Sequence, residues 1–251
     1  MKDIFYESLK DTKGVVYAEK QAEYPGRLHF HRAFELAYIL EGSSHYIVED
    51  EEFDVHEGNI VFAHRCYRHR SSAQPAHTKY VIAVPENITS DIAKLFSDST
   101  LPPLLNDNEF NKTLLPYFEA LVNGKSDMLK ILVKGYSNII FGSLADHYEK
   151  TEIKQKNKNV SIIEDILTYI DEHYCEQLTL ESIANHFGYN KTYFSRLFNG
   201  HIGMSLNNYI NMVRYDKFES VESDRRTVTD LALKCGFTSM STFYRAQKAR
   251  R

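Results

Sequence analysis

The sequence predicts an α+β protein of two domains, a β-rich N-terminal part and an all-helical C-terminal part. Three observations predict this fold class. Short apolar runs separated by turn residues recur over residues 15–85, apolar residues then follow a helical spacing, and a helix–turn–helix pattern occurs twice after residue 160. The chain has 251 residues, 43% of them hydrophobic and 25% charged, so it can bury a core without disulfides.

Two protein classes are excluded by composition. No apolar run approaches the ~18 residues that a membrane span needs, and residues 1–10 contain no apolar signal segment. Cys66, Cys175 and Cys235 have no CxxC spacing, which excludes a disulfide framework and a cysteine zinc site. We therefore expect a cytoplasmic protein with no membrane partner.

Residues 15–85 are expected to form the β-rich part. Residues 34–40 are an almost continuous apolar run that ends at a turn containing Gly42. Further β-rich runs cover residues 45–48, 59–63 and 78–84. Short strands separated by roughly 8–12 residues are typical of a sandwich or a barrel.

Helical spacing begins near residue 88 and continues to residue 150. Apolar positions recur three and four apart in residues 109–123 and 126–149, which predicts two helices. These helices could simply cover the barrel, or they could form a homodimer surface, since an antiparallel pair offers the same patch to both subunits. We expect a homodimer. Residues 151–159 are polar and lysine-rich, and we expect a linker there.

The C-terminal part contains an internal repeat offset by 48 residues. In each copy an apolar-Ala pair is followed, four residues after the alanine, by glycine and an aromatic residue. The copies are Ile183-Ala184 with Gly188-Tyr189, and Leu231-Ala232 with Gly236-Phe237. The alanine allows helices to cross closely, and the glycine takes the left-handed conformation at a helix end. This predicts two helix-turn-helix motifs whose second helices can enter a DNA major groove.

The helix expected between the two copies and the local charge agree with a nucleic-acid partner. Residues 207–222 would form a rod ~24 Å long at 1.5 Å per residue, which would hold the two reading helices about one DNA turn apart. Residues 187–251 contain 11 Lys and Arg against five Asp and Glu, although the whole chain has a net charge of −4. A basic end favours a polyanion partner, but a solvated basic face would give the same count.

The stretch LTLESIANHFGYNKTYFSRLFNGHIGMSLNNYINMVRYDKF, followed by VTDLALKCGFTSMSTFYR, resembles the DNA-binding domain of AraC/XylS-type transcription regulators. The resemblance covers about residues 160–248. It implies a regulator rather than an enzyme, with double-stranded DNA as a partner and RNA polymerase as an indirect partner. By position it implies DNA contacts from Lys191, Thr192, Ser195, Arg196, Ser241, Thr242 and Arg245.

Four large apolar residues of these helices are expected in the core rather than stacked on bases: Phe194, Leu197, Phe198 and Phe243. The family pattern usually has an aromatic residue where Gln247 stands and then continues into a short final helix. We therefore expect the DNA-binding domain at residues 160–251 to lack its last helix.

Histidines are concentrated in the β-rich part, where seven of the eleven lie within 49 residues. His29, His31 and Glu35 share parity, so on one strand their side chains would point to the same side. His69 ends a second β-rich segment. Two imidazoles and a carboxylate from one strand, with a third imidazole from another, can surround a divalent metal ion.

These two segments resemble the two motifs of cupin barrels over about residues 15–85. The resemblance departs at Gly26, which lies nearer the histidines than usual, and at His64, which stands at the usual proline position. It implies an N-terminal cupin-like β-barrel with flanking helices, and a ligand-sensing and dimerisation domain at residues 1–150. Cupin-like sensor domains also commonly precede AraC-type DNA-binding domains.

Three interpretations of His29, His31, Glu35 and His69 stay open. They bind a divalent metal ion, they bind a small organic effector such as a sugar without metal, or they only form hydrogen bonds within the fold. The alternative function is a metal-dependent cupin enzyme, or a metal-bearing sensor with weak or lost DNA binding. An enzyme gives no reason for a repeated helix-turn-helix pattern, so we favour a regulator with a small-molecule effector.

Overall fold

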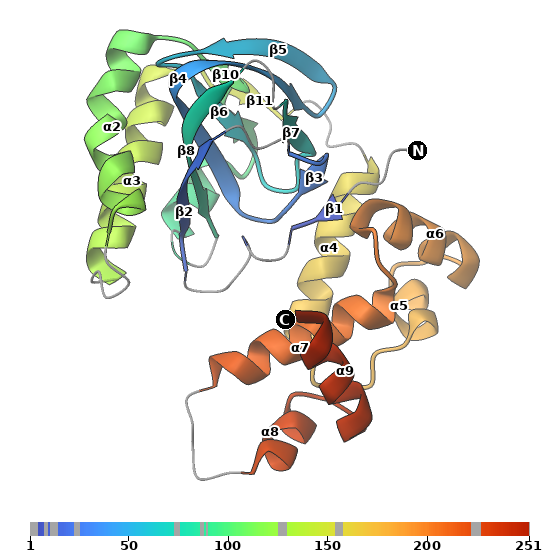
Figure 1. Cartoon of the computed structure of the whole chain (residues 1–251). Coiled ribbons are helices and arrows are strands. Elements are labelled where there is room, and N and C mark those ends of the chain that lie inside the picture. The colour runs from blue at the N-terminus through green and yellow to red at the C-terminus, as the bar shows by residue number, and fades with distance from the viewer. Residues whose placement is uncertain are drawn as a thin grey trace. The chain divides into compact units, whose positions relative to one another are not determined.

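The computed structural model describes residues 5–7, 10, 15–22, 26–72, 76–85, 88, 90–124, 130–153, 158–221 and 227–250 (Figure 1). The chain divides into two compact units, Met1–Lys156 and Asn157–Arg251. The first unit combines a sheet with helices, and the second is helical throughout its described residues. The two-domain α+β class is therefore confirmed. No described helix is both long enough and apolar enough to cross a membrane.

The sheet of the first unit is organised around one long strand, β4 (Phe34–Val48). The first half of β4 pairs with β6 and β8, and its second half pairs with β5 and β7. Gly42 lies where the partners change and has a φ of +80°; a Cβ there would clash with the carbonyl oxygen of Ala76. Only glycine therefore fits this bend. The remaining strands of the sheet are β1 (Phe5–Tyr6), β2 (Tyr17–Ala22), β3 (His29–Phe30), β5 (Glu51–His56), β6 (Ile60–Ala63), β7 (His69–Ser71), β8 (His77–Val84) and β10 (Leu104–Leu105).

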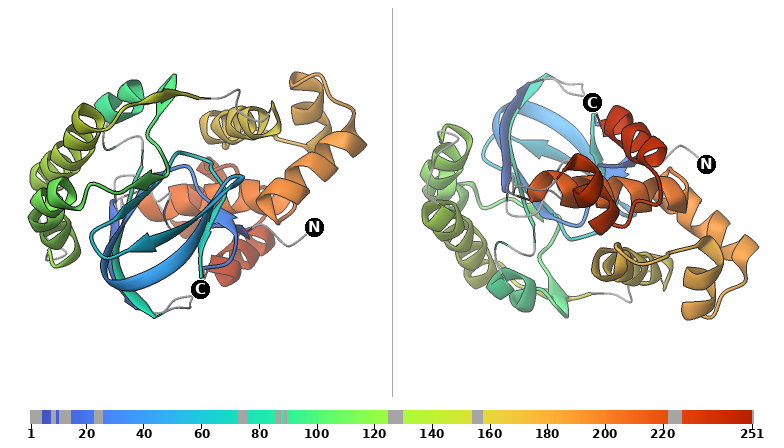
Figure 2. Two further views of the ribbon diagram at one scale, coloured as in Figure 1. Left: turned by 90° about the horizontal axis from the view of Figure 1, so that it is seen from above. Right: turned by 90° about the horizontal axis from the view of Figure 1, so that it is seen from below.

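Alternate side chains of β4 contribute to two different cores. Phe34, Leu36 and Tyr38 pack in the core that includes the helices, and Ala37 and Ile39 pack in the core shared with the second half of the strand. The helices of this unit are α1 (Ser90–Leu95), α2 (Asn108–Val122) and α3 (Lys130–His147), and α2 and α3 lie side by side against one face of the sheet (Figures 1 and 2). Glu35 has the parity of Ala37, which places a carboxylate on the inner side of the sheet.

The range predicted as a linker begins inside the first unit. Thr151–Glu152 forms a short strand, β11, which pairs with β9 (Ser99–Thr100). Backbone pairing has no hydrophobic signature, so the polar composition of this stretch concealed the strand. Residues 154–157 of the predicted linker lie outside the described residues.

The second unit contains six helices in its described residues: α4 (Lys158–His173), α5 (Leu180–His186), α6 (Lys191–Ile202), α7 (Leu206–Ser220), α8 (Val228–Lys234) and α9 (Met240–Arg250). Gly188 and Gly236 follow α5 and α8 with φ of +73° and +88°, which confirms the predicted left-handed conformation. A Cβ on Gly236 would lie 2.6 Å from the carbonyl oxygen of Tyr174, so this glycine also allows a close approach of two backbones.

Side-chain caps and buried aromatic residues fix the two short helix pairs. Asn190 Oδ1 accepts a hydrogen bond from the Tyr193 backbone N–H at 2.8 Å, and Ser239 Oγ accepts one from the Thr242 N–H at 3.2 Å. The predicted core positions are confirmed, since Phe194, Leu197, Phe198 and Phe243 are all buried. The faces of α6 and α9 that carry these residues are therefore not available to a ligand.

Candidate functional site

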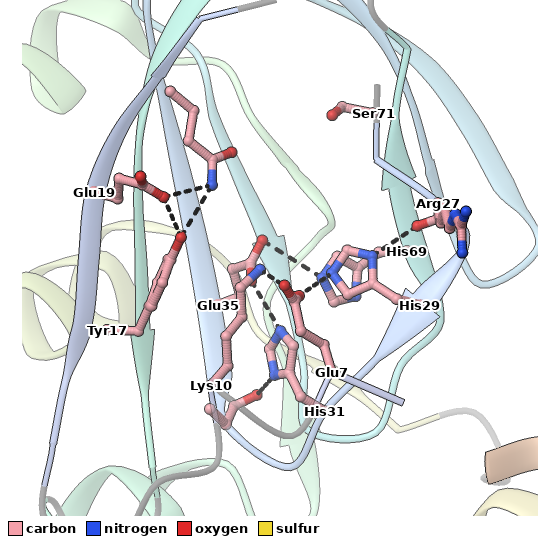
Figure 3. A network of polar contacts seen from close by, with 12 residues as sticks. Glu7, Lys10, Tyr17, Glu19, Arg27, His29, His31, Glu35, His69 and Ser71 are labelled. Carbon is pink, nitrogen blue, oxygen red and sulfur yellow. Dashed lines mark hydrogen bonds and ion pairs between the residues drawn. The ribbon is translucent and has the colours of Figure 1, made fainter. Parts of the chain in front are cut away.

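Four side chains that are distant in the sequence converge inside the first unit. His29 comes from β3, Glu35 from β4 and His69 from β7, and His31 lies between β3 and β4. One ligand atom from each of these residues lies within 4.8 Å of the others (Figure 3). His29 and His69 are register partners in the β3–β7 pair, which brings their rings to 4.2 Å between centroids. The structure thus brings together the four residues that the sequence singled out.

The reason given for this convergence from sequence is wrong in one respect. Residues 29–35 do not form one strand, because residues 31–33 lie outside the sheet between β3 and β4. His31 points inward because its Nε2 lies 2.8 Å from Glu35 Oε2 and its Nδ1 lies 3.1 Å from the Ala33 carbonyl oxygen, not because of strand parity. A turn therefore places this imidazole.

Backbone carbonyls fix the orientation of all three imidazoles. Nδ1 of His29 lies 2.8 Å from the Arg27 carbonyl oxygen, and Nδ1 of His69 lies 2.8 Å from that of Tyr67. A carbonyl only accepts, so the neutral rings of His29 and His69 carry their protons on Nδ1 and leave a lone pair on Nε2. His31 differs, because its Nε2 lies 2.8 Å from Glu35 Oε2 and donates to that carboxylate. The Nε2 atoms of His29 and His69 are buried and lie 3.1 Å from Glu7 Oε2 and 3.4 Å from Glu35 Oε1, but neither makes a well-aligned hydrogen bond among the described residues. This arrangement is the one in which histidine binds a metal ion through Nε2.

A lysine and a second glutamate, which the sequence analysis missed, complete the cluster. Lys10 Nζ lies 2.7 Å from Glu35 Oε2 and 2.9 Å from Glu7 Oε2, and Glu7 Oε2 lies 3.1 Å from His29 Nε2. Lys10 is only 4% exposed. Its position between two carboxylates gives no periodic signal in the sequence, so only the structure reveals it.

Burial and charge keep this cluster in a defined protonation state. Burial lowers the pKa of His31 to about 3, although Glu35 at 2.8 Å from Nε2 opposes the shift, and burial also lowers the pKa of His69. Burial alone would raise the pKa of Glu35, but the charge of Lys10 and the hydrogen bonds from the neighbouring imidazoles hold it well below its usual range. Near neutral pH the cluster thus presents neutral His31 and His69 imidazoles and an ionised Glu35 carboxylate.

The cluster forms one wall of a cavity of about 300 Å³. The cavity is lined by Glu7, Lys10, Gln21, Gly26, Arg27, His29, Glu35, Tyr46, His69, Ser71 and Lys79. Lys79 is 4% exposed, and its Nζ donates to Ser71 Oγ at 2.7 Å and to Tyr46 Oη at 2.9 Å. A lysine in the otherwise apolar run of residues 78–84 was the signal that could have identified it.

Three other basic or imidazole groups of this unit have structural partners. Arg68 Nη2 lies 2.9 Å from Glu49 Oε2, His64 Nε2 lies 3.0 Å from the Phe96 carbonyl oxygen, and His45 Nδ1 lies 2.9 Å from Asp54 Oδ1. The histidine-rich window therefore contains both cavity-lining and structural histidines.

In the second unit, α6 presents a polar face opposite its buried residues. Lys191, Thr192 and Arg196 are exposed, and Ser195 is half-buried with its hydroxyl 3.4 Å from Asn199 Nδ2. Asn199 is exposed and lies one turn beyond Arg196 on the same face, and sequence reasoning missed it. Lys191 Nζ lies 3.9 Å from Glu181 Oε2, so its charge is only loosely paired.

The predicted DNA-contact residues of α9 differ in their exposure. Ser241 and Arg245 are exposed, whereas Thr242 is half-buried and its Oγ1 lies 3.0 Å from the capping hydroxyl of Ser239. Thr242 therefore helps to hold the start of the helix. Tyr244 is 56% exposed beside Arg245 and offers a further contact on this helix.

Comparison with known proteins identifies this second unit. The model of a helix-turn-helix domain family matches residues 183–250. The transcriptional activator AarP of Providencia stuartii is 34% identical over 107 residues, which cover 41% of this chain and 79% of AarP. The chain belongs to the AraC-type family of helix-turn-helix transcription regulators. The Tn10 TetD protein of Escherichia coli is 33% identical over 98 residues, or 39% of this chain and 71% of TetD.

Among solved structures, the fatty-acid-bound ToxT protein of Vibrio cholerae is similar to this AraC-type regulator over 94% of this chain and 90% of ToxT. Its identity is 13% and its TM-score 0.48. AraC-type helix-turn-helix domains bind double-stranded DNA, so the second unit is the DNA-binding part of the regulator.

Proposed function

We propose that this regulator combines a ligand-sensing cupin-like domain in its first unit with two helix-turn-helix motifs, α5–α6 and α8–α9, in its second. In this scheme Lys191, Thr192, Ser195 and Arg196 of α6 contact one major groove. Ser241, Thr242 and Arg245 of α9 contact the next groove. A bound ligand changes transcription only by binding more tightly to one arrangement of the protein than to another.

We propose a divalent transition-metal ion as the first ligand of the pocket. The observation that carries this is the convergence of one possible ligand atom from each of His29, His31, Glu35 and His69, with the Nδ1 atoms of His29 and His69 held by backbone carbonyls. His29, His31, Glu35 and His69 would hold the ion. The donor set fits nickel, zinc, iron, manganese or copper and does not select among them.

Lys10 has a direct bearing on this proposal. Its ammonium lies 2.7 Å from Glu35 Oε2, the oxygen that also faces His31 Nε2. Lys10 therefore places a positive charge next to the proposed metal ligands. A metal ion and Lys10 would then compete for the same carboxylate. Metal binding would release Lys10 from Glu35 and change the contacts of the N-terminal segment that carries it.

A small organic effector is the second candidate ligand, and the cavity volume favours it. A volume of about 300 Å³ exceeds what a single ion needs and lies at the lower end of the ~300–1,000 Å³ found for small-molecule pockets. The family assignment favours a regulator over an enzyme, because catalysis would leave the DNA-binding unit without a purpose.

We propose that a homodimer forms through α3. Ile131 and Ile139 are 75% and 41% exposed, and Gly135 and Gly142 lie between and after them at helical spacing with open space around each glycine. Such a stripe allows two helices to approach closely in an isologous contact. Ile139→Glu should give a monomer in analytical ultracentrifugation, whereas Lys134→Glu on the same helix should not; a dimeric Ile139→Glu variant would place the interface elsewhere.

The main test combines metal analysis with DNA binding. Protein purified without chelator or His-tag should contain about one transition-metal ion per chain by ICP-MS, and a His29→Ala/His31→Ala variant should contain none. Mobility shift on selected DNA, with and without added metal, then tests whether the ion changes DNA affinity. Metal-free protein whose DNA affinity is unaffected by metal would leave the organic effector as the ligand.

A further inference from the structure

The buried ammonium of Lys79 has two neutral partners and no carboxylate. Its Nζ donates to Ser71 Oγ and Tyr46 Oη, and no carboxylate of the described residues lies within ion-pairing distance of it. Lys79 lines the cavity while 96% of its surface is covered, since it is 4% exposed. An ammonium buried without an ion-pair partner is costly, and burial lowers the pKa of Lys79 to about 8, although the charge of Glu35 opposes the shift at longer range.

The two hydroxyls use two of the three N–H donors of Lys79. The third donor is available to a group inside the cavity, and the group that best offsets a buried positive charge is an anion. Gly26, which also lines the cavity, packs closely against β7 here: its N–H donates to the Ser71 carbonyl oxygen at 3.1 Å, and a Cβ would lie 3.3 Å from the Ser71 nitrogen. The pocket thus contains a donor site that faces inward from β8, separate from the imidazole cluster.

The charges that line the cavity also favour an anionic ligand. Among its lining residues Lys10, Lys79 and Arg27 are cationic, and Glu7 and Glu35 are anionic. These three cations and two anions leave a surplus of one positive charge, and both carboxylates lie against Lys10 rather than Lys79. A divalent ion at the histidines would increase that surplus rather than remove it.

We propose that Lys79, with Ser71 and Tyr46, forms an oxyanion subsite, and that the effector is a small molecule carrying a carboxylate or phosphate group. This inference rests on the proposed sensing role of the pocket and names the chemical class of its ligand. A neutral sugar would leave the Lys79 charge uncompensated, whereas an anion forms a charge-assisted hydrogen bond with it. The oxyanion binds at Lys79 and the rest of the ligand extends toward the histidine cluster.

The test measures anion-dependent stabilisation of the full chain at pH 7. Malonate and inorganic phosphate are the anionic probes, and malonamide is the neutral isostere of malonate. A thermal-shift assay should show that at least one anion, but not malonamide, raises the melting temperature of wild-type protein by about 2–4 °C at millimolar concentration. Which anion does so distinguishes a carboxylate from a phosphate ligand.

Lys79→Met should lose this anion-specific shift, and Lys79→Arg should retain most of it because the positive charge remains. Lys20→Met, an exposed lysine on the neighbouring strand β2, is the matched control and should respond like wild type. A shift equal in wild type and Lys79→Met, or no anion-specific shift in wild type, would overturn the subsite. An anion shift that requires Lys79 but leaves DNA affinity unchanged would support the subsite and contradict the effector role.

Discussion

In the first unit the charged side chains of the candidate site are buried against one another, whereas on α6 and α9 of the second unit they are exposed to solvent. Lys10 and Glu35 are 4% and 7% exposed and lie in ion contact. Arg196 and Arg245 are both exposed. Coulombic interactions are strong and poorly screened inside a protein and weak at its surface.

This difference indicates that the buried cluster can respond to a ligand, whereas the exposed faces of α6 and α9 can only bind one. In a buried cluster a large desolvation cost is opposed by strong Coulombic attraction. Adding or removing one charge therefore changes the arrangement of the whole cluster. An exposed arginine stays hydrated in the free protein, so it costs little folding free energy. It forms its bidentate contact only when the base is present. We expect substitutions in the first unit to affect ligand response and stability together, and those on α6 to affect DNA affinity alone.

The largest expected effect is on metal affinity. His29→Ala/His31→Ala removes two of four donors and should weaken zinc or nickel binding by roughly 100-fold or more, since even an outer-shell partner is worth about 10–100-fold. Competition titration against a chromophoric chelator measures this loss. Without metal, the DNA affinity of the variant should equal that of metal-free wild-type protein. The matched control His45→Ala, an imidazole paired with Asp54, should bind metal normally. A parallel loss of DNA affinity would break the proposed separation of the two units.

Acid should destabilise the metal-free first unit. Burial lowers the pKa of His31 to about 3, whereas an imidazole of the unfolded chain has its usual pKa of about 6.5. Below pH 6.5 the unfolded chain therefore binds a proton that the folded chain does not. Stability is thus fully present above pH 6.5 and falls with pH, by about 3 kcal/mol at pH 4.5. The groups around His31 that share this balance are Glu35, Lys10, His69, His29 and Glu7.

Hydrogen-exchange mass spectrometry at pH 6.5 and 4.5, with rates corrected for intrinsic exchange, follows each unit separately. Strands β3, β4 and β7 should lose protection in acid, while α6 and α7 keep theirs, because the described residues of the second unit contain no comparable buried cluster. Equal losses in both units would show that the buried imidazoles do not control acid stability.

The second unit could be predicted from sequence in more detail than the first. Helical spacing is local, so the buried face of α6 and the glycines after α5 and α8 follow from residues a few positions apart. The histidine cluster depends on strand pairing between distant segments. Its four residues were predicted correctly, but the single strand predicted through residues 29–35 was wrong. Lys10 and Glu7 reach the cluster from a short segment without periodicity. Their contact with Glu35 is a tertiary interaction that sequence spacing does not encode.

On the DNA-binding side, Arg196→Ala should weaken specific DNA binding by about 1–3 kcal/mol, the usual value of one bidentate arginine–guanine contact. Fluorescence anisotropy on a selected site and on a scrambled duplex separates lost specificity from lost phosphate contact. Lys234→Ala, an exposed residue of α8, is the matched control, and metal binding in both variants should match wild type. Unchanged affinity in Arg196→Ala would remove this arginine from the reading face and shift attention to Asn199.

The smallest expected effect tests the competition at Glu35. Lys10→Met keeps the length of the side chain but removes the ammonium that lies 2.7 Å from Glu35 Oε2. Without this competing cation, zinc or nickel should bind about 10-fold more tightly, a gain of ~1.4 kcal/mol. Calorimetric titration of both proteins measures the change, with Lys20→Met as the exposed control. Weaker binding in Lys10→Met would mean that the lysine orients the Glu35 carboxylate for the ion, and the two cations would then cooperate instead of excluding each other.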